Sequence, residues 1–561
     1  MICQMCGQDN QDGDKFCCKC GATMAQPEQA PIQAEPTPAQ AEPMPIQAEV
    51  VAPPAKKSPI KLIAIAGAAV LVVLLLLLLV VPKLGGGQYA KVKGELQVLS
   101  KDEETVLVVS GKKTYEIKGE LHAGGSSSMD GTRACVLVDY AYDEGGTLYI
   151  ADAKKAKEVD KGVYAAMMSA DGSSVIYLAN RDEDDNTYDL RLYNGGSKSE
   201  TISSGVDGNS VALSPDGKSV LFTKTIENSD GDMISVGYSK IGSKAVEEID
   251  GKKANAPIAV SNGGKFIFYS RTDNEGNDGL YVRKGKEVDK LSGDYGNVVF
   301  NKDITQAMFT ESKTTNNGST RTSTFISIKG KEKKEVYSAN GFDYFILPSR
   351  TQVGSTGESL IYGVSSFAKT AFRAGDTVCY INGKYEAERQ FSKVSSVRLS
   401  TDGKTVMILN QNSRLFTSSI VKPSEKEIAE DVRGFQAAPD LSSVYFVEID
   451  NTLRFTKGGS KIEKVQDDLE DGFKLSPDGK NAFFIVDDDV LYCSKGGAKP
   501  TKVESDVSDL TVTLDGVYFT KDYSEDDGYG TLYFSTGTPK FTKIIKYFVG
   551  TTSGYDFDFD Y

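Results

Sequence analysis

The residues most able to do chemistry are five cysteines within the first twenty positions. Cys3 and Cys6 form one C-x-x-C pair and Cys17 and Cys20 form a second, each pair followed by glycine. Four thiolates in two such pairs are a common ligand set for a tetrahedral zinc ion. A glycine after each pair lets the backbone turn tightly and aim N–H groups at the sulfurs. The pattern predicts structural rather than catalytic zinc, because a closed all-cysteine set leaves no open coordination position.

Ten residues separate the two pairs, and this short spacing resembles the small zinc ribbon at the N-terminus of many prokaryotic membrane proteins, matched here by CQMCG and FCCKCG. The resemblance implies that residues 1–24 form a zinc ribbon. Cys18 departs from the family pattern and is interpreted as a bystander. The competing interpretation is a redox dithiol pair, but such motifs usually open a helix within a βαβ pattern, which is absent here.

Carboxylates clustered in loops form a second set of side chains able to hold a ligand. The loops DYAYDE, DEDD, ENSDGD, DNEGND and DYSEDDG occur at corresponding positions of repeated units. If the units close into one ring, these loops form an acidic arc that could bind Ca²⁺ or a basic partner. The alternative is solvated hairpin tips, and no loop has EF-hand ligand spacing. The residues of this candidate acidic face are Asp143, Glu144, Asp182, Asp184, Asp185, Asp230, Asp232, Asp273, Asp278, Asp526 and Asp527.

A catalytic triad is not expected, because the chain has one histidine and no G-x-S-x-G motif. His122 is interpreted as a partly exposed histidine at a strand end. A glycosidase-like carboxylate pair stays open, although no pair stands out. Cys135, Cys379 and Cys493 lie among apolar neighbours and are expected in the core rather than in disulfides.

Two segments connect the cysteine-rich head to the rest of the chain. Residues 25–59 are rich in Pro, Gln, Ala and Glu, with few large apolar side chains, and predict an extended linker. Residues 62–81 carry no charge and predict one transmembrane helix, since twenty residues at about 1.5 Å each span the hydrocarbon core.

The lysines closest to the predicted helix and the redox chemistry of the cysteines favour a cytoplasmic N-terminus. Lys56, Lys57 and Lys61 closely flank the N-terminal end of the predicted helix, against Lys83 at the other end. A wider window adds Lys91 and Lys93 and makes the count of lysines equal on the two sides. Thiolate ligands also persist best in a reducing compartment. We therefore expect a single-pass protein of the cell membrane with residues 88–561 outside the cytoplasm. The net charge of -14 and pI near 4.9 argue against nucleic acid as a partner.

Residues 88–561 are built from copies of one short pattern, most clearly LSPDGKSVLFTK and LSPDGKNAFFIVD. Each unit combines an Asp-Gly turn, an alternating strand, a polar loop, a second strand and a Gly-Lys turn, as antiparallel hairpins do. Aligned copies give ten marks 37 to 54 residues apart, at Asp130, Asp171, Asp216, Gly263, Asp303, near Gly357, and at Asp402, Asp440, Asp478 and Asp515.

The SPDGK signature resembles the repeats of the TolB and PD40 propeller group. This resemblance implies a mainly β, WD40-like β-propeller. Ten marks exceed the usual four to eight blades, so one large ring, two rings meeting near residues 338–374, or marks that are not blades all stay open. A β-sandwich array or an open solenoid is the competing fold, and the terminal YDFDFDY is interpreted as a final strand.

This architecture predicts a membrane-anchored binding or scaffold protein whose extracytoplasmic propeller recognises a peptide, glycan or protein. The alternative is an envelope enzyme that acts on glycan or peptide through propeller carboxylates or bound calcium.

Overall fold

The computed structural model describes residues 96–549 with short gaps, all within the second of two compact units, residues 79–561. The predicted zinc ribbon, linker and transmembrane helix lie outside the described residues, as do the repeat mark at Gly357 and the YDFDFDY segment. The gaps are 123–125, 197, 229–230, 241–245, 250–255, 273–277, 315–319, 332, 341–350, 354–358, 362–365, 375, 421–423, 470–471, 488 and 525–527.

The described chain is mainly β, and its strands form antiparallel groups of three or four that we call blades. Blade 1 is β1 (Gln97–Asp102), β2 (Thr105–Ser110) and β3 (Lys113–Lys118), and blade 2 is β4 (Leu121–His122), β5 (Arg133–Ala141), β6 (Gly145–Asp152) and the first half of β7 (Ala156–Met168). Blade 3 is the second half of β7, β8 (Val175–Asp182), β9 (Thr187–Tyr193) and the first half of β10 (Glu200–Leu213). Blade 4 is the second half of β10, β11 (Ser219–Asn228), β12 (Gly231–Lys240) and β13 (Val246–Ile249).

Blades 5 to 8 follow in chain order. Blade 5 is β14 (Ala256–Val260), β15 (Ile267–Thr272), β16 (Asp278–Lys284) and β17 (Glu287–Ser292), and blade 6 is β18 (Val298–Asn301), β19 (Gln306–Thr314), β20 (Thr320–Ile328) and β21 (Lys333–Asn340). Blade 7 is β24 (Ala371–Ala374), β25 (Thr377–Ile381) and β26 (Ala387–Phe391). Blade 8 is β27 (Val394–Leu399), β28 (Thr405–Asn410), β29 (Leu415–Ser419) and β30 (Glu425–Ala429).

Blades 9 to 11 complete the series with four strands each. They are β31 (Val432–Ala437), β32 (Ser443–Glu448), β33 (Leu453–Lys457) and β34 (Ile462–Gln466); β35 (Lys474–Leu475), β36 (Asn481–Val486), β37 (Val490–Lys495) and β38 (Thr501–Glu504); and β39 (Val507–Val512), β40 (Val517–Ser524), β41 (Tyr529–Ser535) and β42 (Phe541–Phe548). Two short strands, β22 (Thr351–Val353) and β23 (Ser359–Ile361), extend blade 6. A 3-10 turn, η2 (Asn262–Gly264), lies between β14 and β15.

Blades 2, 3 and 4 are joined into one ten-stranded sheet because two long strands each serve two blades. The first part of β7 pairs with β6 and its second part pairs with β8. Gly162, with φ of 64°, lies between the two parts. The strand β10 is divided in the same way between β9 and β11.

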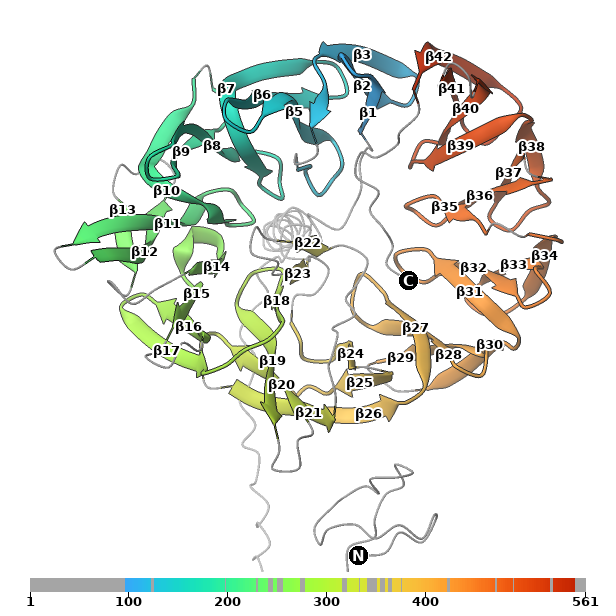
Figure 1. Ribbon diagram of the computed structural model, residues 1–561. Coiled ribbons are helices and arrows are strands. Elements are labelled where there is room, and N and C mark those ends of the chain that lie inside the picture. Colours follow the sequence, from blue (N-terminus) through green and yellow to red (C-terminus); the bar gives the residue numbers. More distant parts are fainter. Residues whose placement is uncertain are drawn as a thin grey trace, which may run out of the picture. The chain divides into compact units, whose positions relative to one another are not determined.

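The core lies between blades, where apolar side chains of consecutive sheets pack face to face. Clusters of buried residues join each blade to the next from blade 1 to blade 11. A further cluster joins Tyr518 and Phe534 of blade 11 to Leu99 and Val109 of blade 1. No described strand of blade 1 pairs with a described strand of blade 11. The eleven blades therefore follow one another around a single ring, closed by side-chain packing (Figure 1).

The Asp-Gly turns of the sequence pattern lie between the first and second strands of blades. In blade 4, Ser214 Oγ donates to Asp216 Oδ1 at 2.7 Å and accepts from the Ser219 backbone N–H at 2.9 Å. Gly217 has φ of 64°, and a Cβ there would lie 2.8 Å from Ser169 Cβ in the corresponding turn of blade 3. The turns thus pack against each other from blade to blade, which explains why serine, aspartate and glycine recur together.

The repeat marks predict the blades well, with two exceptions. Nine of the marks fall in the first turns of blades 2 to 6 and 8 to 11. In blade 7 the turn that precedes β24 lies at residues 366–369, where Ala368 N–H donates to Ser366 Oγ and Lys369 has φ of 58°. Blade 1 has no mark because its described strands correspond to the second, third and fourth strands of other blades. Ten marks therefore underestimate a ring of eleven blades.

The three cysteines predicted to belong to the core are buried and unpaired. Cys135, Cys379 and Cys493 are each at most 1% exposed and form no disulfide. They pack in three different clusters between blades.

Candidate binding face

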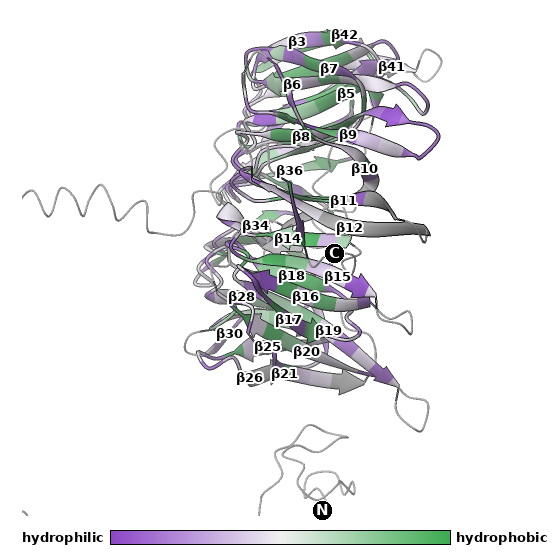
Figure 2. Ribbon diagram, turned by 90° about the vertical axis from the view of Figure 1, so that its left-hand side faces the viewer, coloured by the Kyte–Doolittle hydropathy of each residue, from purple (hydrophilic) through white to green (hydrophobic). Residues whose placement is uncertain are grey.

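In the described strands of each blade, the second strand ends and the third strand begins on one side of the ring, because neighbouring strands within a blade are antiparallel. We call this side the acidic face. The first-to-second and third-to-fourth strand turns lie on the other side. Seen from the edge of the ring, hydrophobic residues occupy the middle of the strands and hydrophilic residues gather at the turns on both sides (Figure 2).

The predicted acidic residues that the structure describes lie in these turns of neighbouring blades. Asp143 and Glu144 follow β5, and Asp182, Asp184 and Asp185 lie at the end of β8 and in the turn that follows it; all five are exposed. Asp278 begins β16 and is also exposed, and Asp232 is the second residue of β12. The remaining members, Asp230, Asp273, Asp526 and Asp527, lie outside the described residues.

Sequence reasoning missed two other acidic turns on this face. Asp102, Glu103 and Glu104 form the turn between β1 and β2, in the blade that separates blade 11 from blade 2. Asp487 and Asp489 lie between β36 and β37 in blade 10. The signal was available, because SKDEET separates two alternating strands and VDDDV interrupts another pair. With Asp522, which is exposed near the end of β40 in blade 11, acidic side chains thus occur on this face in consecutive blades from blade 10 to blade 3.

A row of aromatic rings crosses the acidic face over blades 2 and 3. His122 of β4 stacks on Tyr140 of β5, with ring centroids 4.0 Å apart. Tyr140 meets the edge of Tyr164 at 6.3 Å, and Tyr164 meets Tyr188 at 5.1 Å. Gly208 leaves space for this row, since a Cβ there would lie 2.6 Å from the Tyr188 ring. His122 is half-buried at a strand end, as expected, but its membership of an aromatic row was not predicted.

An arginine is held beside this row by an aromatic ring and a carboxylate. The Arg181 guanidinium lies 4.8 Å from the centroid of the Tyr142 ring and 3.8 Å from Asp143 Oδ1. Its Nε donates to Asn186 at 3.0 Å, and the Tyr164 hydroxyl donates to the Asp143 carbonyl at 2.7 Å. Tyr142 is 71% exposed, so the ring presents most of its surface to solvent.

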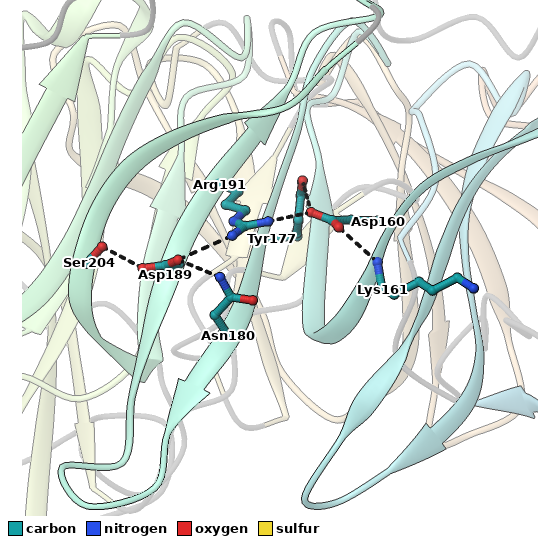
Figure 3. A network of polar contacts seen from close by, with 7 residues as sticks. All are labelled: Asp160, Lys161, Tyr177, Asn180, Asp189, Arg191 and Ser204. Carbon is teal, nitrogen blue, oxygen red and sulfur yellow. Dashed lines mark hydrogen bonds and ion pairs between the residues drawn. The ribbon is translucent and has the colours of Figure 1, made fainter.

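A polar network ties blade 2 to blade 3 beneath these loops (Figure 3). Arg191 Nη1 donates to Asp160 Oδ2 at 2.8 Å, and Arg191 Nη2 lies 3.4 Å from Asp189 Oδ2. The Tyr177 hydroxyl and the Lys161 backbone N–H also donate to Asp160. Asp189 accepts from Ser204 Oγ at 2.5 Å and from Asn180 Nδ2 at 2.8 Å. Figure 3 shows the Lys161 ammonium pointing away from the network.

The pKa shifts of this network belong to a structural ion pair. Burial raises the pKa of the Tyr177 hydroxyl to about 12, so it stays protonated and donates at neutral pH. Burial alone would raise the pKa of Asp189, but donors from Ser204, Asn180 and Arg191 outweigh it and lower that pKa. The pKa of Arg191 is raised because the attraction of Asp160 outweighs the effect of burial. Asp189 and Arg191 therefore stay charged at neutral pH.

The lowered pKa values of aspartates in the first-to-second strand turns also indicate a structural role for these residues. In Asp171, Asp402 and Asp478 burial would raise the pKa, but hydroxyl, lysine and backbone N–H donors lower it overall. A general acid at neutral pH needs the opposite shift. These aspartates therefore act as turn-stabilising acceptors.

Among residues 96–549 as described, no group of three or more His, Cys, Asp or Glu side chains comes together as metal ligands. The predicted zinc ligands Cys3, Cys6, Cys17 and Cys20 lie outside this part of the chain. Within the same part, no helix is long and apolar enough to cross a membrane.

Comparison with known proteins gives distant similarity of fold only. No family model and no curated protein matches the sequence. A solved eukaryotic initiation factor is 10% identical with a TM-score of 0.41, over 67% of this chain and 97% of that chain. The β-propeller domain of the trilobed protease from Pyrococcus furiosus is 11% identical, with a TM-score of 0.30, over 60% and 98%. A putative TolB from Agrobacterium tumefaciens is 13% identical, with a TM-score of 0.27, over 44% and 90%.

Proposed function

We propose that this chain is a membrane-anchored binding protein whose propeller lies outside the cytoplasm and recognises a positively charged segment of a peptide or protein. The observation that carries the proposal is the acidic face itself. Acidic turns of consecutive blades surround the aromatic row on the same side of the ring. Such a surface attracts cationic partners over long range and holds their side chains at short range.

Arg181 shows how the face accommodates a cation. Its guanidinium lies against the Tyr142 ring and beside the Asp143 carboxylate. An aromatic face together with a carboxylate is the combination that binds lysine and arginine side chains of a partner. Further exposed carboxylates at Asp182, Asp184 and Asp185 are available nearby for additional cations. We prefer binding to the alternative of an envelope enzyme, because this arrangement accounts for recognition without any catalytic group.

The test of recognition uses the full chain in detergent micelles with a labelled decalysine peptide and a decaglutamate peptide. Decalysine should bind and decaglutamate should not, and the affinity for decalysine should fall steeply with salt. Changing Asp182, Asp184 and Asp185 together to Asn should weaken decalysine binding roughly tenfold, since exposed charges contribute modestly.

A matched control neutralises three exposed or half-buried carboxylates on the other side of the ring, Glu287, Glu386 and Glu463, each changed to Gln. This variant should keep the original affinity. Equal losses in the two triple variants, or equal binding of the two peptides, would remove the acidic face as the recognition surface.

The proposed anchor and orientation rest on residues 62–81 and on the cytoplasmic preference of the cysteine-rich head. Protease added to intact cells should destroy an epitope in the propeller and spare one in residues 1–24 until the cells are broken. Loss of the N-terminal epitope first would invert the topology and place the acidic face in the cytoplasm.

A further inference from the structure

We propose that the side of the ring opposite the acidic face docks on an anionic lipid surface. We call it the lysine face, defined by the first-to-second and third-to-fourth strand turns of the blades. This inference takes its geometry from the proposed membrane anchor and adds a second interaction surface. The whole chain has a net charge of -14, so composition alone does not predict a basic face.

The positive charge of the lysine face comes from the third-to-fourth strand turns. Exposed lysines occupy these turns in blades 1, 2, 3, 5, 6, 7, 9, 10 and 11. They occur in pairs at residues 112–113 in blade 1, at Lys457 and Lys461 in blade 9, and at Lys495 and Lys499 in blade 10. Because these turns join the two outer strands of each blade, the lysines are spread around the ring.

Several carboxylates on the same face have local partners. In the first-to-second strand turns, Asp402 lies 3.2 Å from Lys404 and Asp478 lies 2.6 Å from Lys480. Asp152 accepts hydrogen bonds from the backbone N–H groups of Lys154 and Lys155, while both lysine side chains stay exposed. The positive charge of the face comes from the exposed lysines in the third-to-fourth strand turns of nine blades, and these side chains are long enough to reach a surface.

The chain begins its described course on this face. The Leu96 backbone N–H donates at 2.9 Å to Gly131, in the first turn of blade 2, and β1 starts at the next residue. Residues 82–95, fourteen in number, separate the predicted transmembrane helix from Leu96. Fully extended, this connection would span about 50 Å at most, and it joins the described chain on the lysine face.

A dispersed set of lysines suits a membrane better than a compact anion. Lysines near an anionic bilayer each add attraction, which decays within about one Debye length of 8–10 Å. A planar array over many blades matches a planar sheet of phosphate groups, whereas a single phosphate would contact only one turn. Docked in this way, the acidic face would point away from the bilayer, toward partners in solution.

The test compares lysine reactivity in the full chain reconstituted into vesicles of phosphatidylcholine alone or mixed with phosphatidylglycerol. A membrane-impermeant acetylating reagent modifies outward-facing molecules, and mass spectrometry reports each site. Modification of Lys457, Lys461, Lys495 and Lys499 should slow several-fold with phosphatidylglycerol and recover at high salt. Lys161 and Lys393, exposed in connections on the acidic face, are matched controls and should react equally in both lipids.

A charge-reversal variant separates docking from other causes of protection. Changing Lys457, Lys461, Lys495 and Lys499 together to Glu should restore fast modification at residues 112–113 on the same face. The double variant Lys161→Glu and Lys393→Glu should keep those residues protected. Equal reactivity in the two lipids, or equal protection of both faces, would overturn the proposal.

Failure of the anchor gives a different result from failure of the docking face. If alkaline carbonate extracts the chain from the vesicles, residues 62–81 do not insert and the membrane anchor is wrong. The same acetylation measurement on chain mixed with preformed vesicles then decides on the lysine face by itself.

Discussion

Replacing Arg191 by methionine removes the guanidinium that ties Asp160 of blade 2 to Asp189 of blade 3. The Arg191, Asp160 and Asp189 side chains are 22%, 24% and 20% exposed. Breaking a fully buried ion pair costs about 3–5 kcal/mol, and an exposed pair is worth at most about 1 kcal/mol. The remaining donors from Tyr177, Ser204 and Asn180 limit the damage. We expect unfolding free energy to fall by about 2–3 kcal/mol at neutral pH.

The pH dependence of this loss has a definite sign. The folded-state pKa of Asp189 is lowered, so the stability that its ionised form contributes is present above its unfolded pKa, about 3.9. That contribution is lost as the pH falls through the folded-state pKa. Without Arg191 the pKa of Asp189 moves back toward its ordinary value. The difference in stability between the two proteins should therefore shrink below about pH 4.

The assay is urea unfolding of the full chain in detergent, followed by tyrosine fluorescence because the chain has 27 tyrosines and no tryptophan. Lys461→Met is the control, since Lys461 and Glu463 form an exposed pair with 80% and 42% exposed side chains. It should change stability by less than about 0.5 kcal/mol. A loss equally small for Arg191→Met, or one that grows at acid pH, would refute the assignment of this network.

Four further outcomes follow from the packing, the thiols and the cysteine-rich head. Gly479→Ala should lower the thermal midpoint far more than Gly458→Ala, because both have positive φ but only at Gly479 would the Cβ clash, 2.3 Å from Ala438 Cα. Phe548→Ala, which empties a fully buried position at the junction of blades 11 and 1, should cost about 3–5 kcal/mol in urea unfolding, whereas Tyr547→Ala, at a 60% exposed side chain, should cost little. Burial raises the pKa of Cys135 to about 12 and that of Cys493 to about 11, so neither thiol should react with a disulfide reagent at pH 8 until urea unfolds the chain. Elemental analysis of the purified chain should find one zinc, lost on changing Cys3 and Cys6 to Ser but retained on changing Cys18 to Ser.

Sequence periodicity predicted the blades because the turn chemistry is local. Serine, aspartate and glycine at fixed offsets satisfy one another within each turn, as Ser214, Asp216 and Gly217 do. The turn at residues 366–369 was not predicted, because SSFAKT keeps the serine but has no Asp-Gly pair. Its likeness to the other turns lies in the positive φ of Lys369, which the residue types do not show. Blade 1 was not predicted, because the repeat marks lie in first-to-second strand turns and no such turn is among the residues described before β1.

The candidate site was predicted in part for a related reason. Acidic runs at equivalent loop positions are visible in sequence, and ring closure brings them to one face. The aromatic row was not recognised, because His122, Tyr140, Tyr164 and Tyr188 belong to different strands and come together only through the packing of those strands. The lysine face was hidden as well, since its lysines were noted only as parts of Gly-Lys turns. Both features require knowledge of which turns lie on the same side.

Closure without strand pairing between blades 11 and 1 makes the ring a cycle in which the chain is interrupted at that one junction. The Val549 backbone N–H already donates at 3.0 Å to the Lys101 carbonyl, while Leu96 contacts blade 2 on the opposite face. A linker from Val549 to Leu96 would have to cross the wall of the ring from one face to the other. The first strands of blades 8 and 9 cross the ring wall along the same path. The linker would therefore lie beside the free edge of β1, in the position of a first strand for blade 1. A circular permutant joined in this way and opened between blades 8 and 9 would keep every packed cluster, with its termini at a new position on the same circle.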